Sequence, residues 1–143
     1  MVSVLVTAQN NERHVAATIE SVLRQSLADL ELLIVDDGSR DSTPDLLSQI
    51  VDERVAVTIH TESAGIPPRR NELLARARGR YIAPLDADDV WFPDRLARQV
   101  AVLEAQPSLT VVGSDVMVVD NAVGIGPYFR APRSDAAIRW WSL

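Results

Sequence analysis

The stretch Leu33–Ser39 reads LIVDDGS, and the stretch Tyr81–Asp89 reads YIAPLDADD. Both are apolar runs that stop at carboxylates, which indicates a buried strand whose end brings charge to the rim of a sheet. In open α/β sheets this rim is where ligands bind. The two stretches therefore predict one acidic site that holds a metal ion and a charged ligand.

Strand and helix patterns alternate on both sides of these stretches. Short apolar runs predict strands at Val2–Thr7, Leu32–Val35, Val55–Ile59 and Tyr81–Leu85, and a longer β-rich run covers Leu109–Val119. Helical spacing of apolar residues, or proline at a helix start, predicts helices near residues 15–23, 43–50 and 67–77 and from residue 93 onward. This alternation favours a layered α/β domain with a mostly parallel central sheet.

Two local features do not fit a regular pattern. Pro84 falls inside a predicted strand, where proline cannot donate a ladder hydrogen bond, so we expect the last turn of the strand or a bulge there. The tail from Gly124 to Leu143 is expected to be a loop followed by a helix that ends in Trp140-Trp141.

Composition narrows the class of protein. The chain has 143 residues, of which 47% are apolar, so we expect a single domain over residues 1–143 with a real core. The net charge of −6 argues against a nucleic-acid partner, and the lack of cysteine excludes disulfides and thiolate metal sites. There is neither a basic leader nor an apolar run near the ~20 residues of a membrane helix. We therefore expect a cytoplasmic protein, with peripheral membrane contact left open.

Several spaced blocks occur together in the chain: Val4–Asn10, Ile19–Ser26, Glu31–Asp41, Ala64-Gly65 with Arg69–Asn71, Gly79–Ile82 with Leu85–Asp89, and Pro93–Leu96. In this order they resemble the nucleotide-sugar-binding half of family 2 glycosyltransferases, whose Rossmann-like α/β/α fold is called GT-A. The resemblance covers nearly the whole chain. It implies a truncated domain, because nothing before Leu143 matches the acceptor-binding half of the family or its catalytic base.

The resemblance implies roles for the residues near the first acidic stretch. Thr7 and Gln9 would line the pocket of the nucleobase, although the family often has tyrosine where Gln9 stands. Asp37 would accept a hydrogen bond from the base, and Asp36 would orient the loop. Arg70 would balance the diphosphate or close over the nucleotide.

The second acidic stretch carries an Asp-x-Asp pair. Two carboxylates at a strand end form the partial oxygen cage that Mg²⁺ or Mn²⁺ prefers when phosphates supply the remaining ligands. By resemblance Asp88 is the direct metal ligand, Asp86 lies near the ribose or a metal-bound water, and Asp89 supports the loop. Trp91 and Phe92 are expected to pack beneath this loop.

These features together predict an enzyme. The resemblance implies a glycosyltransferase that moves a sugar with inversion from a nucleoside diphosphate sugar, with a lean toward UDP, to a hydroxyl of an unknown glycan, lipid or protein acceptor. The base that takes the hydroxyl proton is not identified; Asp115, Asp120 and Asp135 are available but match no motif.

Other functions are weighed against this one. A nucleotide-sugar-binding module without turnover is the alternative, because the acceptor half does not match, and association with a second copy is left open. A phosphoacceptor domain is disfavoured because the chain contains no lysine, and a dinucleotide oxidoreductase because no Gly-x-Gly-x-x-Gly follows the first strand. His14 and His60 are expected to be structural or solvent-exposed.

Overall fold

The computed structural model describes residues 1–120 and 124–131. The chain divides into two compact units, one from Met1 to Val100 and one from Ala101 onward. The expectation of a single domain over residues 1–143 stays a prediction.

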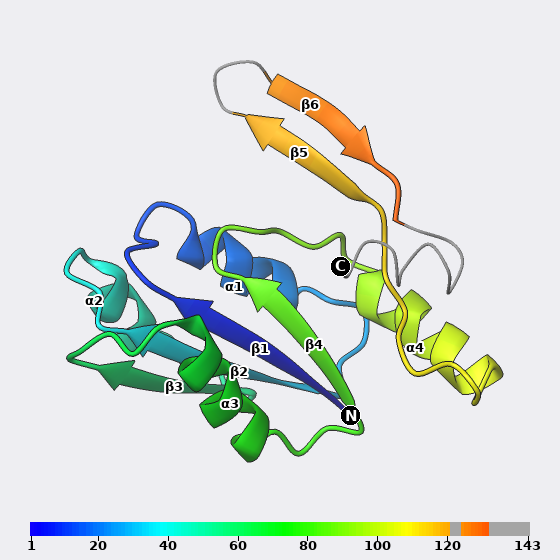
Figure 1. Ribbon diagram of the computed structural model, residues 1–143, viewed down its shortest axis with the longest axis horizontal. Helices are drawn as coiled ribbons and strands as arrows, with labels where there is room; N and C mark the ends of the chain where they lie inside the picture. Colours follow the sequence, from blue (N-terminus) through cyan, green and yellow to red (C-terminus); the bar gives the residue numbers. More distant parts are fainter. Residues whose placement is uncertain (121–123, 132–143) are drawn as a thin grey trace. The chain divides into compact units, whose positions relative to one another are not determined.

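The first unit is built on a four-stranded sheet (Figure 1). Its strands are β1 (Val2–Ala8), β2 (Leu30–Asp37), β3 (Val55–His60) and β4 (Tyr81–Asp86). They lie in the order β3-β2-β1-β4, and every pair in the sheet is parallel. All four therefore end at the same edge, which confirms the mostly parallel sheet and brings the two acidic stretches to one rim.

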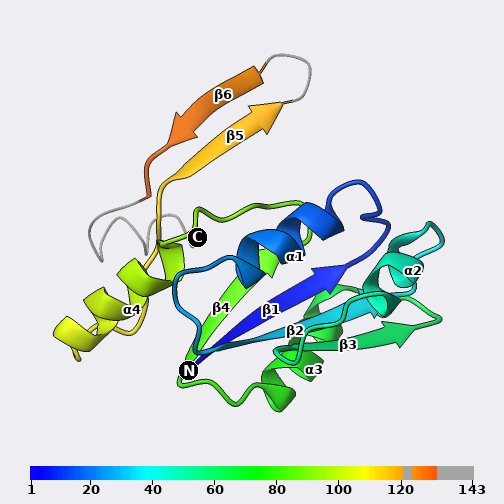
Figure 2. The ribbon, with the colours of Figure 1, turned by 180° about the vertical axis from the view of Figure 1, so that it is seen from behind.

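Helices cover both faces of this sheet. They are α1 (Val15–Leu23), α2 (Thr43–Ser48), α3 (Ile66–Arg76) and α4 (Arg95–Ala105), the last of which begins in the first unit. Figures 1 and 2 show α3 on one face and α1 and α2 on the opposite face. The predicted layered α/β/α arrangement is therefore confirmed.

Alternation along the strands divides the core between the two faces. Even-numbered apolar residues of β1 and β2 pack with Val15, Leu47 and Leu96 of α1, α2 and α4. On the other face, Leu5 and Leu33 pack against Leu73 of α3 in a smaller cluster. A side chain's parity in the strand thus decides which helix layer it meets.

Pro84 does not form the expected bulge or last turn. It pairs in regular parallel register with Leu5 of β1, two residues before β4 ends. Among the described residues β4 lies at an edge of the sheet, and proline is tolerated on an edge strand because its missing N–H is needed by no neighbour.

The second unit also differs from the expectation. Only Val116–Asp120 of the β-rich run forms a strand, β5, and it pairs with β6 (Gly124–Phe129) in an antiparallel hairpin rather than joining the parallel sheet. Residues 124–129 were expected to be loop. The expected helix ending in Trp140-Trp141 lies outside the described residues.

Glycine makes the sharp exit from β2 possible. Gly38 follows the strand directly with a φ of +68°. A Cβ atom there would lie 2.7 Å from the backbone nitrogen of Ser63 and 2.8 Å from the carbonyl carbon of Glu62. The loop after β2 therefore packs directly on the loop before α3.

Membrane-spanning helices are absent from the part of the chain that the structure describes, because no helix there combines the length and the apolar character that this role requires.

Candidate functional site

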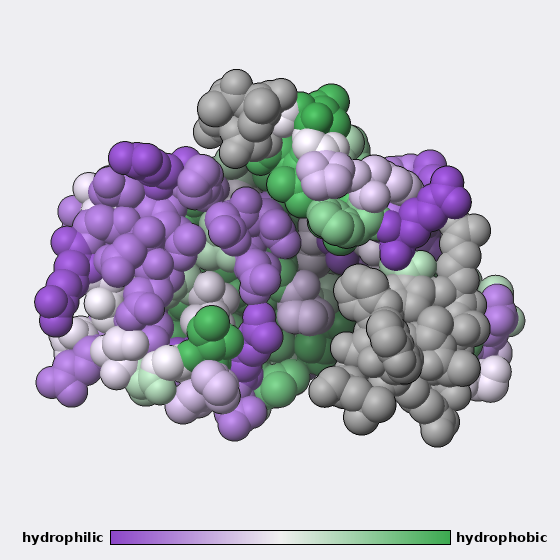
Figure 3. All heavy atoms as spheres, turned by 45° about the horizontal axis from the view of Figure 1, so that its top comes forward, coloured by the Kyte–Doolittle hydropathy of each residue, from purple (hydrophilic) through white to green (hydrophobic). Residues whose placement is uncertain are grey.

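The carboxyl ends of three strands meet at the candidate site. The register sets Ala8 of β1 opposite Asp36 of β2, and Thr7 of β1 opposite Asp86 of β4. The two acidic stretches therefore end on either side of β1, at one edge of the sheet. The surface around the loops that follow β1, β2 and β3 is largely hydrophilic, at the left of Figure 3.

Strand parity separates the two neighbouring aspartates of the first stretch. Asp37 lies two residues after Val35, which packs in the cluster under α3, so its side chain faces the α3 layer. Asp36 faces the opposite layer and is fully buried. It accepts hydrogen bonds from the backbone N–H of Ser39, at 3.0 Å, and from the Ser39 hydroxyl. Asp36 thus shapes the loop after β2, and its contact with a substrate stays a prediction.

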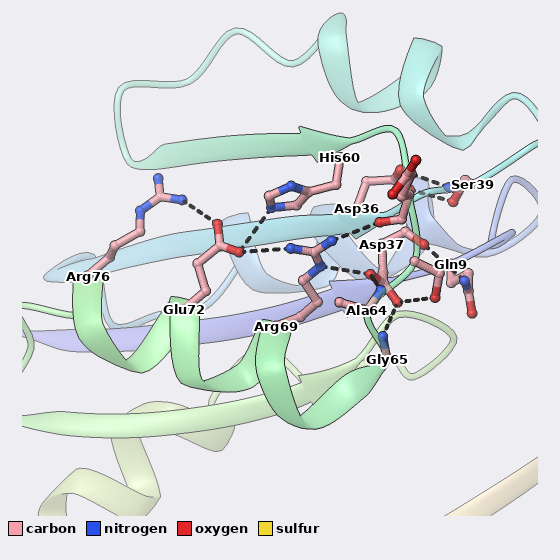
Figure 4. A network of polar contacts seen from close by, with 12 residues as sticks. Gln9, Asp36, Asp37, Ser39, His60, Ala64, Gly65, Arg69, Glu72 and Arg76 are labelled. Carbon is pink, nitrogen blue, oxygen red and sulfur yellow. Dashed lines mark hydrogen bonds and ion pairs between the residues drawn. The ribbon is translucent and has the colours of Figure 1, made fainter.

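Asp37 is almost fully buried, at 2% exposure, and its carboxylate is saturated with donors. It accepts hydrogen bonds from Ser63 Oγ at 2.6 Å, Arg69 Nε at 2.7 Å, Ala64 N at 2.8 Å and Gly65 N at 2.9 Å (Figure 4). A carboxylate offers about four lone-pair positions, so this network uses all of them. Asp37 therefore anchors the loop that leads into α3.

The same network sets the charge of Asp37. Burial raises the pKa of the Asp37 carboxyl, but the hydrogen bonds from Ser63, Ala64, Arg69 and Gly65 outweigh it and hold the pKa well below its ordinary value. The aspartate is therefore ionised, and Arg69 is its counter-ion. The pKa of Arg69 is raised, chiefly by this bond to Asp37.

Arg69 and Glu72 extend this network along α3. Arg69 Nη2 donates to the carbonyl oxygen of Glu62 at 2.8 Å, and Arg69 Nη1 lies 3.4 Å from Glu72 Oε2. The same Glu72 oxygen lies 2.9 Å from His60 Nε2 at the end of β3 (Figure 4). His60 therefore has the structural role that the sequence favoured. The sequence favoured a solvated helix face for Arg69 and gave no role to Glu72, although their i, i+3 spacing places them on one helix face.

Arg70 is in a different environment from Arg69. Its side chain is 48% exposed and its Nη2 donates to Asp86 Oδ1 at 2.8 Å. Asp86 is 66% exposed at the end of β4. Two residues that the sequence assigned to a bound ligand are therefore brought together and pair with each other.

Asp86, Asp88 and Asp89 form the acidic turn after β4. Burial raises the pKa of Asp89, and the charges of Asp88 and Asp86 raise it further, against a smaller opposite effect of Arg95. Within residues 1–120 and 124–131, no group of three or more histidine, cysteine, aspartate and glutamate side chains is placed to hold a metal ion. Two carboxylates are nevertheless a sufficient protein contribution where a phosphate ligand supplies the other oxygens, so the donor set fits Mg²⁺ or Mn²⁺ in that form.

Thr7 and Gln9 lie at the same edge. The Oγ1 atom of Thr7 is buried and has no hydrogen-bond partner. Gln9 Nε2 donates to the backbone oxygen of Asp37 at 2.9 Å, which ties the end of β1 to the end of β2. A buried hydroxyl without a partner is uncommon and indicates a missing water or ligand. Thr7, which the sequence predicts to line the nucleobase pocket, thus has a hydroxyl that is available to bind a ligand.

Other predicted residues have structural surroundings. Trp91 is 6% exposed and packs in the main core, with the Arg95 guanidinium 4.4 Å from its ring centre, whereas Phe92 is 71% exposed, so the expected packing was wrong for Phe92. Asp115 accepts hydrogen bonds from the Tyr128 hydroxyl and from Ala131 N. Asp120 ends β5, and Asp135 lies outside the described residues.

Comparison with known protein families gives one match over most of the chain. The family model described as glycosyl transferase family 2 covers residues 3–136. A Bacillus subtilis glycosyltransferase named for teichuronic acid biosynthesis, TuaG, is 37% identical over 94% of this chain and 54% of its own length. The Escherichia coli UDP-Glc:alpha-D-GlcNAc-diphosphoundecaprenol beta-1,3-glucosyltransferase WfaP is 36% identical over 74% of this chain and 42% of its own. The chain thus spans about half the length of these curated relatives.

Solved structures show the same fold. A crystal structure of S. aureus TarS 1–349 in complex with UDP-GlcNAc superposes with a TM-score of 0.71 at 23% identity, over 88% of this chain and 37% of that one. The mannosyltransferase PcManGT from Pyrobaculum calidifontis, in complex with GDP-Man and Mn²⁺, gives a TM-score of 0.67 at 27% identity, over 84% and 35%. The GT-A-type fold expected from the sequence is therefore confirmed.

Proposed function

This chain belongs to glycosyl transferase family 2, and from that membership we propose that it binds the nucleoside diphosphate sugar donor of a metal-dependent, inverting glycosyltransferase. The observation that carries the proposal is the strand register, which sets Asp36 and Asp86 on either side of the end of β1. The rim of a parallel sheet is where α/β proteins bind nucleotides. The hydrophilic loops and the unpaired Thr7 hydroxyl at this rim support a polar ligand.

We propose that the nucleobase lies near Thr7 and Gln9. The Thr7 hydroxyl has no protein partner to lose, so a hydrogen bond to the ligand would be a net gain. Asp37 remains the proposed acceptor for the base, on one condition. All four of its acceptor positions are used, so one present donor has to be displaced before the base can bind. The Ser63 hydroxyl is the proposed one, because Ala64 and Gly65 donate from the backbone and Arg69 is also held by Glu62 and Glu72.

The diphosphate would lie toward β4. Asp88 and Asp86 are the proposed ligands of Mg²⁺ or Mn²⁺, and Arg70 is the proposed partner of a phosphate oxygen. A divalent cation bound there supplies Lewis-acid stabilisation of the charge that develops on the departing diphosphate. The chain's own part is to orient the donor.

The relatives support a proposal for the donor and the acceptor. WfaP is named for UDP-Glc, while TarS was crystallised in complex with UDP-GlcNAc and PcManGT was solved in complex with GDP-Man. We propose a UDP-linked hexose as the donor. The acceptor is proposed to be a hydroxyl of a glycan or of a lipid-linked sugar, as the name of WfaP suggests.

Calorimetric titration with UDP, GDP and ADP, with and without Mn²⁺, tests the proposal. We expect UDP to bind only with the cation, and Asp88→Asn to weaken binding by about tenfold or more, because one of two carboxylate ligands is lost. Glu53→Gln removes the same charge just before β3, at the end of the strands opposite to the proposed site. This variant is expected to bind UDP like the unmodified protein. Failure of every nucleotide to bind at any Mn²⁺ concentration would contradict the proposal.

A donor-binding unit without turnover is the second candidate. It is favoured by the observation that every proposed ligand residue lies within Met1–Val100, while no carboxylate of the described residues is assigned as the base. Assays of donor hydrolysis and of sugar transfer separate the two candidates. Metal-dependent UDP binding without either activity would favour the binding unit.

A further inference from the structure

The ion pair between Arg70 and Asp86 joins two elements that border the proposed donor site. Arg70 lies near the start of α3, and Asp86 is the last residue of β4. Arg70 Nη2 donates to Asp86 Oδ1 at 2.8 Å. The side chains are 48% and 66% exposed, so packing does not fix either of them against its partner. Such a pair can form and break at little cost.

The neighbouring arginine fixes the backbone from which Arg70 projects. Arg69 is only 12% exposed and is bound to Asp37, Glu62 and Glu72. The backbone N–H of Gly65, just before α3, is held by Asp37 as well. The backbone at the start of α3 is therefore anchored, while the exposed side chain of Arg70 can exchange one hydrogen-bond partner for another.

The charges around Asp86 explain why a cation is needed there. Asp86 ends β4 and is followed within three residues by Asp88 and Asp89, so this part of the rim concentrates negative charge. In the protein without ligands, the guanidinium of Arg70 is the positive charge in direct contact with Asp86. A divalent cation at Asp86 would meet this guanidinium as a like charge at close range.

A diphosphate offers Arg70 a better partner than one exposed carboxylate does. Its oxygens carry more charge than a carboxylate and match the forked geometry of a guanidinium, which favours two parallel hydrogen bonds. Transfer of Arg70 from Asp86 to the diphosphate would at the same time free the carboxylate. Binding of the diphosphate to Arg70 therefore promotes binding of the cation to Asp86.

We propose that Arg70 is a built-in counter-ion that exchanges partners when the donor binds. It holds Asp86 in the free protein, yields Asp86 to the divalent cation, and turns to the diphosphate. The inference rests on the donor site proposed above and adds how that site is regulated. When the cation is present without nucleotide, Arg70 competes with it for Asp86. When the nucleotide is also present, Arg70 binds the diphosphate and leaves Asp86 to the cation. Binding of the cation and binding of the nucleotide therefore favour each other.

The test measures the two ligands separately on the full chain. Free Mn²⁺ is followed by electron paramagnetic resonance in the absence of nucleotide, and UDP binding by calorimetry at saturating Mn²⁺. In Arg70→Gln we expect Mn²⁺ alone to bind about three- to tenfold more tightly, because a like charge is gone. We expect UDP to bind about tenfold more weakly, because a phosphate partner is gone.

Two further variants serve as controls. Arg70→Lys keeps the charge and is expected to bind Mn²⁺ within about twofold of the unmodified protein, while it loses part of the UDP affinity because lysine lacks the fork. Arg24→Gln breaks an exposed pair with Glu20 on α1 and is expected to change neither affinity.

Opposite shifts in Arg70→Gln support the exchange. An unchanged or lower Mn²⁺ affinity in this variant overturns it, even where the unmodified protein binds UDP with Mn²⁺ and the donor site stands. An unmodified protein that binds neither Mn²⁺ nor UDP overturns the donor site and the exchange together.

Discussion

At the scale of single residues, Asp37 is a buried carboxylate whose hydrogen bonds and ion pair favour its ionised form. Its pKa is held below the ordinary value, so it contributes stability that is complete above the unfolded-state pKa of about 3.9 and is lost as pH falls below it. We expect Asp37→Asn to lower the free energy of unfolding by about 2–3 kcal/mol at pH 7, because Arg69 loses its buried counter-ion and keeps only the longer ion pair with Glu72. Urea denaturation measures this loss.

The dependence on pH distinguishes this mechanism from a loss of packing. The difference between Asp37→Asn and the unmodified protein should be equal at pH 7 and pH 5 and smaller at pH 3. Asp52→Asn is the matched control, since Arg54 lowers the pKa of Asp52 to about 2 in a more exposed pair, and a much smaller loss is expected. A difference for Asp37→Asn that stays constant down to pH 3 would contradict the assigned role.

Thr7 carries a second prediction at this scale. Thr7→Val removes a hydroxyl that has no partner, and valine suits a strand equally well, so stability should stay within about 0.5 kcal/mol or rise slightly. UDP affinity should fall by about three- to tenfold because the ligand loses a hydrogen bond. Chemical denaturation and calorimetry measure the two effects on the same sample.

Thr18 offers the contrasting case. Its hydroxyl donates to the carbonyl oxygen of Ala87 at 2.9 Å and is buried. Thr18→Val should therefore cost about 1–2 kcal/mol, since a buried carbonyl is left without its donor. Equal stability losses in the two threonine variants would mean that the Thr7 hydroxyl has a partner after all.

At the scale of elements, the turn after β2 and the turn before α3 depend on two glycines with positive φ. Gly38 has a φ of +68° and faces the backbone of Glu62 and Ser63, whereas Gly65 has a φ of +86° and open space where a Cβ would lie. Gly65→Ala should cost about 1–2 kcal/mol for backbone strain alone, since a φ of +86° with a ψ of 166° is a conformation that is essentially limited to glycine. Gly38→Ala should cost about 2 kcal/mol or more, because the loops have to move apart as well.

Denaturation curves of the two glycine variants rank these costs. The ranking weighs loop contact against backbone strain, since both glycines have a positive φ but only Gly38 has backbone atoms within reach of a Cβ. A Gly65→Ala variant as destabilised as Gly38→Ala would show that strain, and not contact between the loops, governs this region.

At the scale of the whole molecule, the two units are expected to differ in stability. Strands β1 and β2 are paired on both sides and buried on both faces, so their amides should exchange most slowly. The β5–β6 hairpin has two strands, and consecutive residues such as Val118 and Val119 are exposed. A two-stranded hairpin alone is marginally stable, so its amides should exchange fast.

Hydrogen exchange followed by mass spectrometry resolves these segments. Protection of the hairpin equal to that of β1 would contradict the expectation and would mean that another surface covers its apolar side chains. Peptides from β3 and β4, which lie at the edges of the described sheet, should show intermediate protection.

The sequence alone determined the order of strands and helices in the first unit and the acidic ends of β2 and β4. These features depend on local patterns, because the period of apolar residues decides between strand and helix over a few residues. The parallel sheet then follows from the alternation, and the resemblance supplied the family and the GT-A fold. Pro84 and the β5–β6 hairpin escaped this reasoning because edge position and pairing are not local properties.

Tertiary structure alone decided what each charged residue does at the rim. Asp36 and Asp37 are adjacent in sequence, yet their side chains lie on opposite faces of the pleated strand. Asp36 therefore binds the loop after β2, whereas Asp37 binds Arg69 of α3. Arg69 and Arg70 look alike in the sequence, yet Arg69 is only 12% exposed and bound to Asp37, whereas Arg70 is 48% exposed and bound to Asp86. Burial and pairing depend on segments that lie 16 to 32 positions apart and meet only when the sheet and α3 have packed.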